Sequence, residues 1–250
     1  MRKIAVINQK GGVGKTTTAA NLSHALAIKG FHVTMIDLDP QNQLASHFGA
    51  FKFNMDGIDR IMAGAALLKD VIIEVRNNLQ LIPAGGTLSG LERLNNKQYE
   101  SIFVDLLDTL NYQDFIFIDC PPSSGILIEY ALSGVDELLI PIAGDYLAMR
   151  GLSDLVMTLK DYEKNNEKKF KWWIVVTRYH LRRKLCREVM DKIVEYFPET
   201  VLATPIREKS VIAEAPGFGQ TVFEYRQGRH GKDDYNSLAE NFLTGKYYNG

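Results

Sequence analysis

The feature that most constrains the fold is the octet Lys-Gly-Gly-Val-Gly-Lys-Thr-Thr at residues 10–17, which directly follows the apolar run 3–7. Gly14, Lys15 and Thr16 match the end of the pattern G-x-x-x-x-G-K-[ST], although the glycine expected at its start is replaced by Gln9. A strand, a glycine-rich turn and a helix in this order predict a phosphate-binding loop rather than an ordinary turn. The octet also contains a second lysine, Lys10, for which this pattern does not account.

Each residue type in the loop has a chemical reason. Consecutive backbone N–H groups wrap a phosphate only with torsions that side chains resist, and the glycines supply these torsions. The N-terminus of the following helix adds free N–H groups and the positive end of its dipole. Lys15 is expected to reach the outer phosphates, the Thr16 hydroxyl to ligate Mg²⁺ and Thr17 to donate to an inner phosphate. Lys10 is either a solvated loop lysine or a cation directed at the phosphates of a second molecule, as an arginine finger is.

Two further apolar runs end in carboxylates. The run 31–36 precedes Asp37 and Asp39, which the alternation of side chains places on one face of a strand end. The run 115–118 precedes Asp119, a Walker B pattern whose carboxylate organises Mg²⁺, and a stiff pair of prolines follows. Taken alone, each aspartate suits a turn or a helix cap. Beside a phosphate-binding loop, however, the ends of strands are where open α/β sheets bind ligands.

The rest of the chain alternates strands and helices, which predicts an α/β fold with a mostly parallel twisted sheet and helices on both faces. With 250 residues, 46% of them hydrophobic, the chain can bury a full core as a single domain over 1–250. The expected strands include 79–83, 137–141, 172–176 and 201–204, and the expected helices include 87–110, 151–165, 181–197 and 231–243.

Composition also bears on the compartment. The sequence has no apolar run of about 18 residues, so we expect no membrane-spanning helix. The first strand begins too early to leave room for a signal peptide. Two cysteines, Cys120 and Cys186, make no disulfide framework and fit a reducing cytoplasm. The net charge of −1 excludes nothing, because nucleic-acid binding depends on where charge is concentrated.

Together the three sites resemble the ParA-type partition ATPases, within the MinD/ParA family of P-loop proteins with a deviant Walker A motif. The resemblance is carried by 8–17, 36–41, 117–122, 145–152 and 214–220, and so runs through most of the chain. The sequence departs from the family in two places. Arg150 stands where the family usually has an acidic residue, and Val211 stands where some relatives have an arginine that contacts DNA.

The resemblance implies an ATPase that needs Mg²⁺, forms a homodimer with ATP and binds DNA without sequence preference. A ParB-like or cargo-adaptor protein would stimulate hydrolysis, and the cycle would segregate plasmid or chromosome DNA or position a large cargo in the cytoplasm, at the nucleoid. It implies that Lys10 reaches the partner's nucleotide, that Asp39 orients or activates the attacking water and that Asp119 holds the Mg²⁺ shell, with Asp37 in support. The implied catalytic residues are Lys10, Lys15 and Asp39, and the implied metal residues are Thr16, Asp39 and Asp119.

Adenine is the favoured base, because the turn after the strand 172–176 lacks the Asn-Lys-x-Asp sequence with which a GTPase of this architecture reads guanine. By analogy with the family, the base lies between this turn and residues 205–207. The nucleotide-binding residues predicted in this way are Lys10, Gly11, Gly12, Val13, Gly14, Lys15, Thr16, Thr17, Thr177, Arg178, Pro205 and Arg207.

The stretch 160–192 has eleven basic and five acidic residues, an excess of six that suits contact with phosphates regardless of base sequence. A solvated helix face is the alternative interpretation. Four of the basic residues lie at the start of a helix, where cations are unfavourable unless an anion is near. The predicted DNA contacts are Arg182, Arg183, Lys184, Arg187 and Lys209, with Arg226, Arg229 and Lys232 as further candidates.

Three other functions remain open at this point. A MinD-type membrane ATPase needs an amphipathic C-terminal helix, and the tail 244–250 is short and polar. A redox relative similar to the nitrogenase iron protein would have to bridge a cluster with Cys120 and Cys186. A nucleotide-gated positioner of protein cargo, with no role in DNA segregation or with negligible turnover, would leave the function to its partner.

Overall fold

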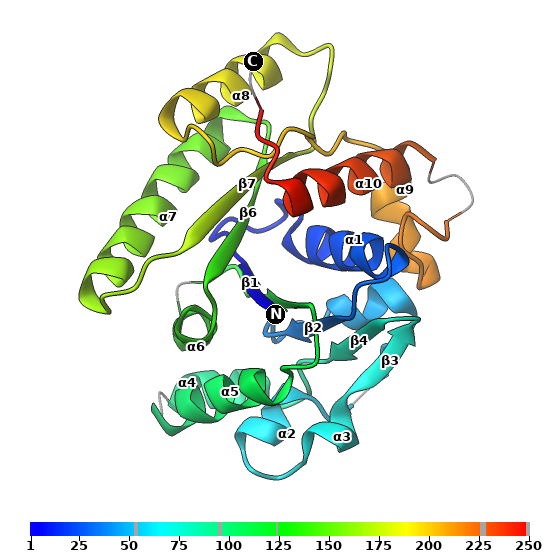
Figure 1. The fold of residues 1–250 in the computed structure, drawn as a ribbon, viewed down its shortest axis with the longest axis vertical. Coiled ribbons are helices and arrows are strands. Elements are labelled where there is room, and N and C mark those ends of the chain that lie inside the picture. The colour runs from blue at the N-terminus through cyan, green and yellow to red at the C-terminus, as the bar shows by residue number, and fades with distance from the viewer. Residues whose placement is uncertain (53–54, 95–96, 124, 226–228, 249–250) are drawn as a thin grey trace.

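A seven-stranded sheet forms the centre of the computed structural model, which describes residues 1–52, 55–94, 97–123, 125–225 and 229–248 (Figure 1). The strands lie in the order β3-β4-β2-β5-β1-β6-β7. β3 runs antiparallel to β4, and every other neighbouring pair is parallel, so the predicted fold class is confirmed. The strands are β1 (Arg2–Val6), β2 (Val33–Asp37), β3 (Ile73–Arg76), β4 (Leu79–Ile82), β5 (Phe115–Asp119), β6 (Glu137–Ala143) and β7 (Lys171–Thr177).

Helices cover both faces of the sheet, with α1 and α10 on one side and α4 to α7 on the other (Figure 1). The α-helices are α1 (Lys15–Ile28), α2 (Ile58–Met62), α3 (Leu68–Val71), α4 (Leu88–Leu94), α5 (Lys97–Thr109), α6 (Ile126–Gly134), α7 (Tyr146–Asn165), α8 (Lys184–Tyr196), α9 (Ser210–Glu214) and α10 (Arg229–Thr244). Two short 3₁₀ helices are η1 (Leu44–Phe48) and η2 (Ala215–Phe218).

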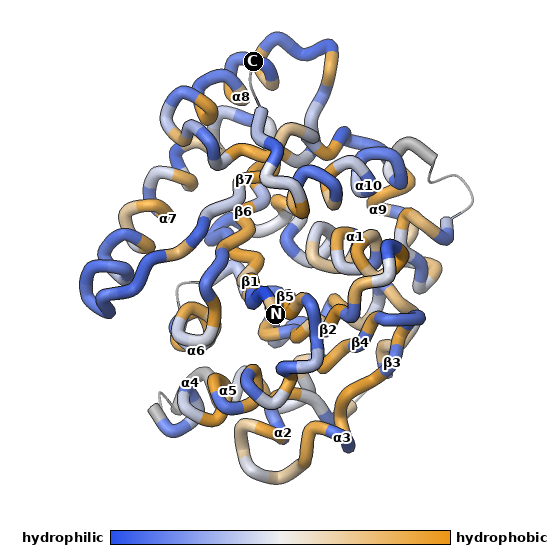
Figure 2. Tube along the Cα trace, in the orientation of Figure 1, coloured by the Kyte–Doolittle hydropathy of each residue, from blue (hydrophilic) through white to orange (hydrophobic). Residues whose placement is uncertain are grey.

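The central strands are buried on both faces, which is why they appear in the sequence as unbroken apolar runs. In β1, Ile4 and Val6 join the core beneath α1 and α10, whereas Ala5 joins the core beneath α5 and α6. The same alternation holds in β5 and β7. Figure 2 shows the hydrophobic colour concentrated on these strands and the hydrophilic colour at the outer ends of α7 and α8.

Three predicted elements differ from the structure. The strand expected at 201–204 is reduced to isolated bridges at Val201 and Leu202, because the chain touches the edge of β7 there and then turns away. The helix expected at 87–110 is divided into α4 and α5. α7 begins at Tyr146 rather than near 151, because the Asp145 carboxylate accepts a hydrogen bond from the Ala148 N–H at 2.8 Å and caps the helix earlier.

The strand register brings the predicted site together. β5 lies between β2 and β1, and Asp119 is in register with Asp37 on one side and Val6 on the other. Because all three strands are parallel, their carboxyl ends meet at one edge of the sheet. The phosphate-binding loop leaves β1 at this same edge.

Candidate functional site

The loop between β1 and α1 has the backbone that its glycines predict. Gly12 and Gly14 have φ angles of 72° and 91°, in the left-handed region that favours glycine. Gly14 is also the N-cap residue of α1, and no side chain caps that helix. The free N–H groups at the start of α1 therefore remain available to an anion at the loop.

Neighbouring strands anchor this loop at both ends. At its start, the buried Asn8 side chain donates to the Pro141 carbonyl of β6 at 2.8 Å and accepts from the Lys10 N–H at 2.9 Å. Near its end, the Thr177 hydroxyl of β7 donates to the Val13 carbonyl at 2.7 Å. The loop is thus preorganised, and the hydroxyl of Thr177, which the sequence predicted to bind nucleotide, is engaged in holding it.

Asp119 and Lys15 are buried together at the end of β5. Among the described residues, neither carboxylate oxygen of Asp119 has a hydrogen-bond partner of ordinary geometry. The pKa of Asp119 is raised to about 7, mainly by burial and also by the Asp39 carboxylate, while the Thr16 hydroxyl and the Lys15 ammonium oppose the shift. Burial also lowers the pKa of Lys15, against the opposing effect of Asp119 and Asp39.

The two aspartates after β2 have different surroundings. Asp37 is fully buried and accepts hydrogen bonds from the N–H groups of Asp39 at 2.9 Å and Leu44 at 3.0 Å, so it closes the turn after the strand. Burial raises the pKa of Asp37 well above its usual range, and Asp119 adds to the effect. Asp39 is half-buried, and one of its oxygens accepts from the Gln41 N–H at 3.0 Å. Asp39 is thus the more accessible of the two.

Lys10 occupies the outer side of the loop and bonds within its own chain. Its ammonium lies 3.1 Å and 3.3 Å from the two carboxylate oxygens of Asp145, the residue that caps α7. The two side chains are 36% and 46% exposed, so the pair lies at the surface. Lys15, by contrast, is buried, which separates the two lysines of the octet by environment.

A cavity of about 440 Å³ opens beside the loop, and it is lined by Val13, Gly14, Thr17, Thr177, Arg178, Ile206, Arg207, Lys209 and Tyr235 among others. Of the residues predicted for the base, Pro205 is not part of this lining. Arg207 bonds to Asp234 of α10, with 2.9 Å between Nε and Oδ1. Tyr235 was not predictable from the sequence, because nothing in the pattern of α10 brings it to the loop.

The chain is similar in sequence to proteins of known family over nearly its whole length. A family model described as an AAA domain matches residues 1–172. The chain is 34% identical over 248 residues to the chromosome-partitioning ATPase Soj of Treponema pallidum, covering 97% of both chains. It is 33% identical over 253 residues to the chromosome partitioning protein ParA of Myxococcus xanthus, covering 97% of this chain and 88% of that one. The chain belongs to the Soj/ParA family of partition ATPases.

A solved structure agrees with the fold of this Soj/ParA chain. The cobyrinic acid a,c-diamide synthase of Mycobacterium smegmatis, crystallised with ADP and magnesium, superposes with a TM-score of 0.81. It is 28% identical and covers 97% of this chain and 94% of its own. The resemblance drawn from the sequence motifs is therefore confirmed at the level of family and fold.

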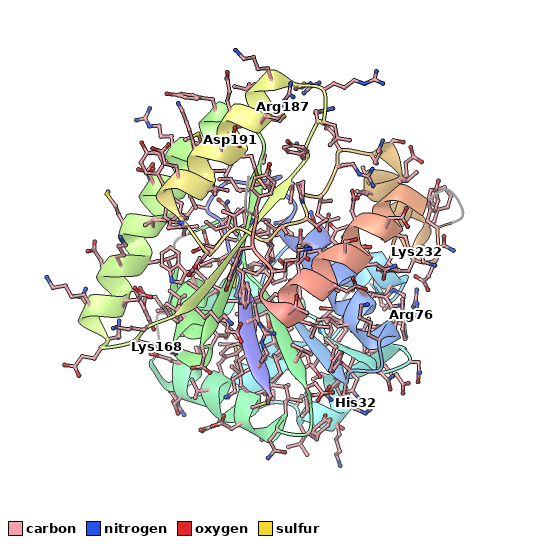
Figure 3. The ribbon with its side chains drawn as sticks, turned by 45° about the horizontal axis from the view of Figure 1, so that its top comes forward. His32, Arg76, Lys168, Arg187, Asp191 and Lys232 are labelled. Atoms are coloured by element: carbon pink, nitrogen blue, oxygen red, sulfur yellow. The ribbon has the colours of Figure 1, made fainter. Side chains whose placement is uncertain are left out.

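The basic stretch of this Soj/ParA chain is divided by its fold. Arg182, Arg183, Lys184 and Arg187 are exposed at the start of α8, after the carboxyl end of β7. Lys168 lies near the opposite end of β7, where its ammonium bonds the carbonyls of Leu132 and Ser133 at 2.8 Å and 2.7 Å (Figure 3). The basic residues of the stretch 160–192 thus lie on two separate surfaces. Lys209, also predicted for DNA, lines the cavity beside the loop, and Arg226 lies outside the described residues.

The surroundings of the two cysteines bear on the redox alternative. Both thiols are buried, and they donate weakly to the carbonyls of Ile118 and Gly144, respectively. Burial raises the pKa of Cys120 well above its usual range, which disfavours the thiolate that a cluster needs. As for the membrane, the described part of the chain contains no helix of the length and apolarity needed to cross a bilayer.

Proposed function

We propose that this partition ATPase forms a dimer when it binds ATP, binds DNA without sequence preference and hydrolyses ATP when an activator protein stimulates it. The observation that carries the proposal is the pairing of two lysines in different environments. Lys15 is buried beside Asp119, whereas Lys10 is half-exposed on the outer side of the same loop. One lysine suits the nucleotide of its own chain and the other suits a nucleotide held by a second copy.

The residues present fit a magnesium ion. The two unpartnered carboxylate oxygens of Asp119 and the Thr16 hydroxyl near them are hard oxygen donors. Magnesium takes a few protein oxygens and completes its octahedron with water and phosphate. When bound, the ion would neutralise phosphate charge, and the related M. smegmatis structure holds ADP and magnesium in a fold of this kind. We therefore infer ATP and Mg²⁺ as the ligands.

Each of the remaining site residues has a distinct task in this proposal. Lys15 neutralises the outer phosphates, and the loop N–H groups hold the phosphates in place. Asp39 is half-buried, close enough to affect the pKa values of Lys15 and Asp119, and is free to orient the attacking water with its second oxygen. Asp37 keeps the turn that carries Asp39 closed, through two backbone hydrogen bonds.

Dimerisation requires Lys10 to change partner. Within one chain it is held by Asp145 at 3.1 Å, and reaching a second copy's phosphates means breaking that ion pair. An exposed pair of this type is weak, on the order of 0.2–1 kcal/mol, and a triphosphate offers much more negative charge than one carboxylate. The intrachain pair is therefore a resting position that a bound nucleotide can displace.

Replacement of Lys10 tests the dimer. We expect Lys10→Ala to bind a fluorescent ATP analogue about as well as the wild type but to lose ATP-dependent dimerisation and turnover. Lys15→Ala should lose nucleotide binding itself, and the exposed Lys69→Ala should change neither property. Hydrolysis by Lys10→Ala at the wild-type rate would refute the role of this lysine across the dimer.

DNA binding is proposed for the exposed cluster at the start of α8, formed by Arg182, Arg183, Lys184 and Arg187. A dimer presents such a cluster twice, which suits sequence-independent contact with strong dependence on salt. We expect Arg182→Glu with Arg183→Glu to weaken retention of duplex DNA, more at low salt than at high salt. The control is Lys164→Glu with Lys169→Glu, the same change of charge elsewhere on the molecule. Equal loss in both variants would show a general charge effect instead of a site.

We also propose that residues 1–250 form a single domain that works in the cytoplasm at the nucleoid. Two features support this proposal. Both cores share one sheet. The C-terminal tail is tied to the fold, since Leu202 pairs with Tyr247 and the Tyr248 N–H donates to the Val201 carbonyl at 2.9 Å. Pelleting with anionic liposomes in the presence of ATP would contradict the proposed location.

A further inference from the structure

A second cavity lies away from the nucleotide site, between α7 and α8. Its volume is about 760 Å³, larger than the 440 Å³ beside the phosphate-binding loop. Tyr146, Met157 and Tyr196 line it and are 65%, 63% and 69% exposed. Large side chains that gather around a hollow and stay open to water are typical of a surface that another molecule covers.

The residues that α7 contributes form a single stripe along the helix. Tyr146, Met149, Ser153, Met157 and Lys160 recur at three- and four-residue spacing, so they lie on one face. From the first to the last, this stripe is about 21 Å long at 1.5 Å per residue. A groove of that length between two helices matches about four turns of a third helix laid along it.

The charge of the groove selects the kind of helix. Arg150, Lys160 and Lys192 line it, and no acidic side chain does so among the described residues. On α8, the nearby Glu188 is paired with Lys184 at 3.2 Å. Asp191 is exposed on α8 and is not part of the lining (Figure 3). An occupant with an apolar stripe and acidic flanks would complement these three cations.

We propose that the groove between α7 and α8 docks an acidic amphipathic helix of the activator protein. The inference rests on the proposed function only in assuming that an activator exists. The groove opens at Tyr146, directly after Asp145, which caps α7 and holds Lys10 at 3.1 Å. A helix docked at that end therefore lies next to the ion pair that must break when Lys10 leaves its resting position.

DNA and a second copy of this chain fit the groove less well. Phosphate contacts need cations alone and gain nothing from a strip of methionine and tyrosine side chains. A second copy would bring the same three cations to the groove, because a two-fold interface is made of the same surface on both subunits. Like charges would then face one another across an apolar contact.

Peptide selection tests the proposal on the full-length protein. A displayed library of random 16-residue peptides is selected on the wild type, and enriched peptides are measured by fluorescence anisotropy at low and high salt. We expect enriched peptides to carry net negative charge with apolar residues at helical spacing. They should bind at least about fivefold more weakly to Lys160→Glu with Lys192→Glu, and equally well to the control Lys52→Glu with Lys69→Glu.

Several results would overturn the proposal. They are failure to enrich any peptide that distinguishes the wild type from the groove variant, enrichment of basic or neutral peptides, and displacement of the peptide by a DNA duplex. Loss of the ATP-dependent dimer in the groove variant alone would make the groove an interface between copies. Basal ATP turnover is measured for every variant in the same buffer. Absence of turnover would count against the proposed function, whereas peptide binding alone decides whether the groove is a docking site.

Discussion

Replacing Asp145 by asparagine separates its two roles. Asp145 caps α7 through the Ala148 N–H at 2.8 Å and holds Lys10 at 3.1 Å. Asparagine is as good an N-cap as aspartate but carries no charge, so Asp145→Asn keeps the cap and breaks the ion pair. In the proposed dimer Lys10 leaves Asp145 to reach a second copy, so the variant should form the ATP-dependent dimer more readily.

The size of the effect follows from the exposure of the pair. With side chains 36% and 46% exposed, the ion pair contributes on the order of 0.2–1 kcal/mol. Two such pairs would break in each proposed dimer, so removing them should tighten dimerisation by roughly 0.4–2 kcal/mol, or about 2- to 30-fold. The gain should shrink as salt rises, because screening weakens the pair in the wild type.

Sedimentation velocity with a non-hydrolysable ATP analogue and Mg²⁺ measures the dimer dissociation constant. The matched control is Asp108→Asn, which breaks the exposed pair with Lys3 at 2.6 Å, far from the phosphate-binding loop. The double variant Lys10→Ala with Asp145→Asn should show no gain over Lys10→Ala alone. An Asp145→Asn dimer that is no tighter than the wild type, with α7 intact by circular dichroism, would refute the reasoning.

Three further predictions concern catalysis and stability. Asp39→Ala should lower turnover roughly 100-fold or more and accumulate the ATP-bound dimer, and normal cycling in a phosphate-release assay would remove Asp39 from the catalytic residues. Gly219→Ala should destabilise the protein by roughly 1–3 kcal/mol in urea unfolding, because the new Cβ would lie 2.6 Å from the Gly49 Cα at a φ of 65°. Gly217→Ala is the control, because its new Cβ would meet nothing within 4 Å. Equal losses of stability in the two variants would disprove the contact. Burial lowers the pKa of His47 to about 4, so the unfolded chain binds a proton at higher pH than the folded chain does. The free energy of unfolding, relative to that of His47→Gln, should therefore fall by up to roughly 3 kcal/mol as the pH drops from about 6.5 to about 4. Parallel urea midpoints for the two proteins over that pH range would contradict this shift.

The ends of strands were predictable because they depend on local pattern. The apolar runs before Asp37 and Asp119 had to be buried strands, and a carboxylate that follows such a run has to lie at the strand end. The glycines of the loop likewise predicted left-handed backbone torsions, which Gly12 and Gly14 adopt. These features need only a few consecutive residues, so sequence alone was enough.

Features that join distant segments were not predictable in this way. The partner of Lys10 lies 135 residues further along the chain, and nothing in the loop points to Asp145. The Thr177 hydroxyl holds the Val13 carbonyl because β7 packs beside the loop, a contact that the sequence did not predict. Lys209, predicted as a DNA contact, lies in the lining of the cavity beside the loop, which the sequence did not indicate.

The sequence by itself determined which chemistry is available: a phosphate-binding loop with an additional lysine, and carboxylates at two strand ends. Tertiary structure decided which of these groups are buried, which are paired and which remain free. It divided one basic stretch between the two ends of β7, and it opened a groove between α7 and α8. The physical reason is that residue type fixes charge and hydrogen-bonding capacity locally, whereas desolvation and pairing depend on neighbours that only the folded chain supplies.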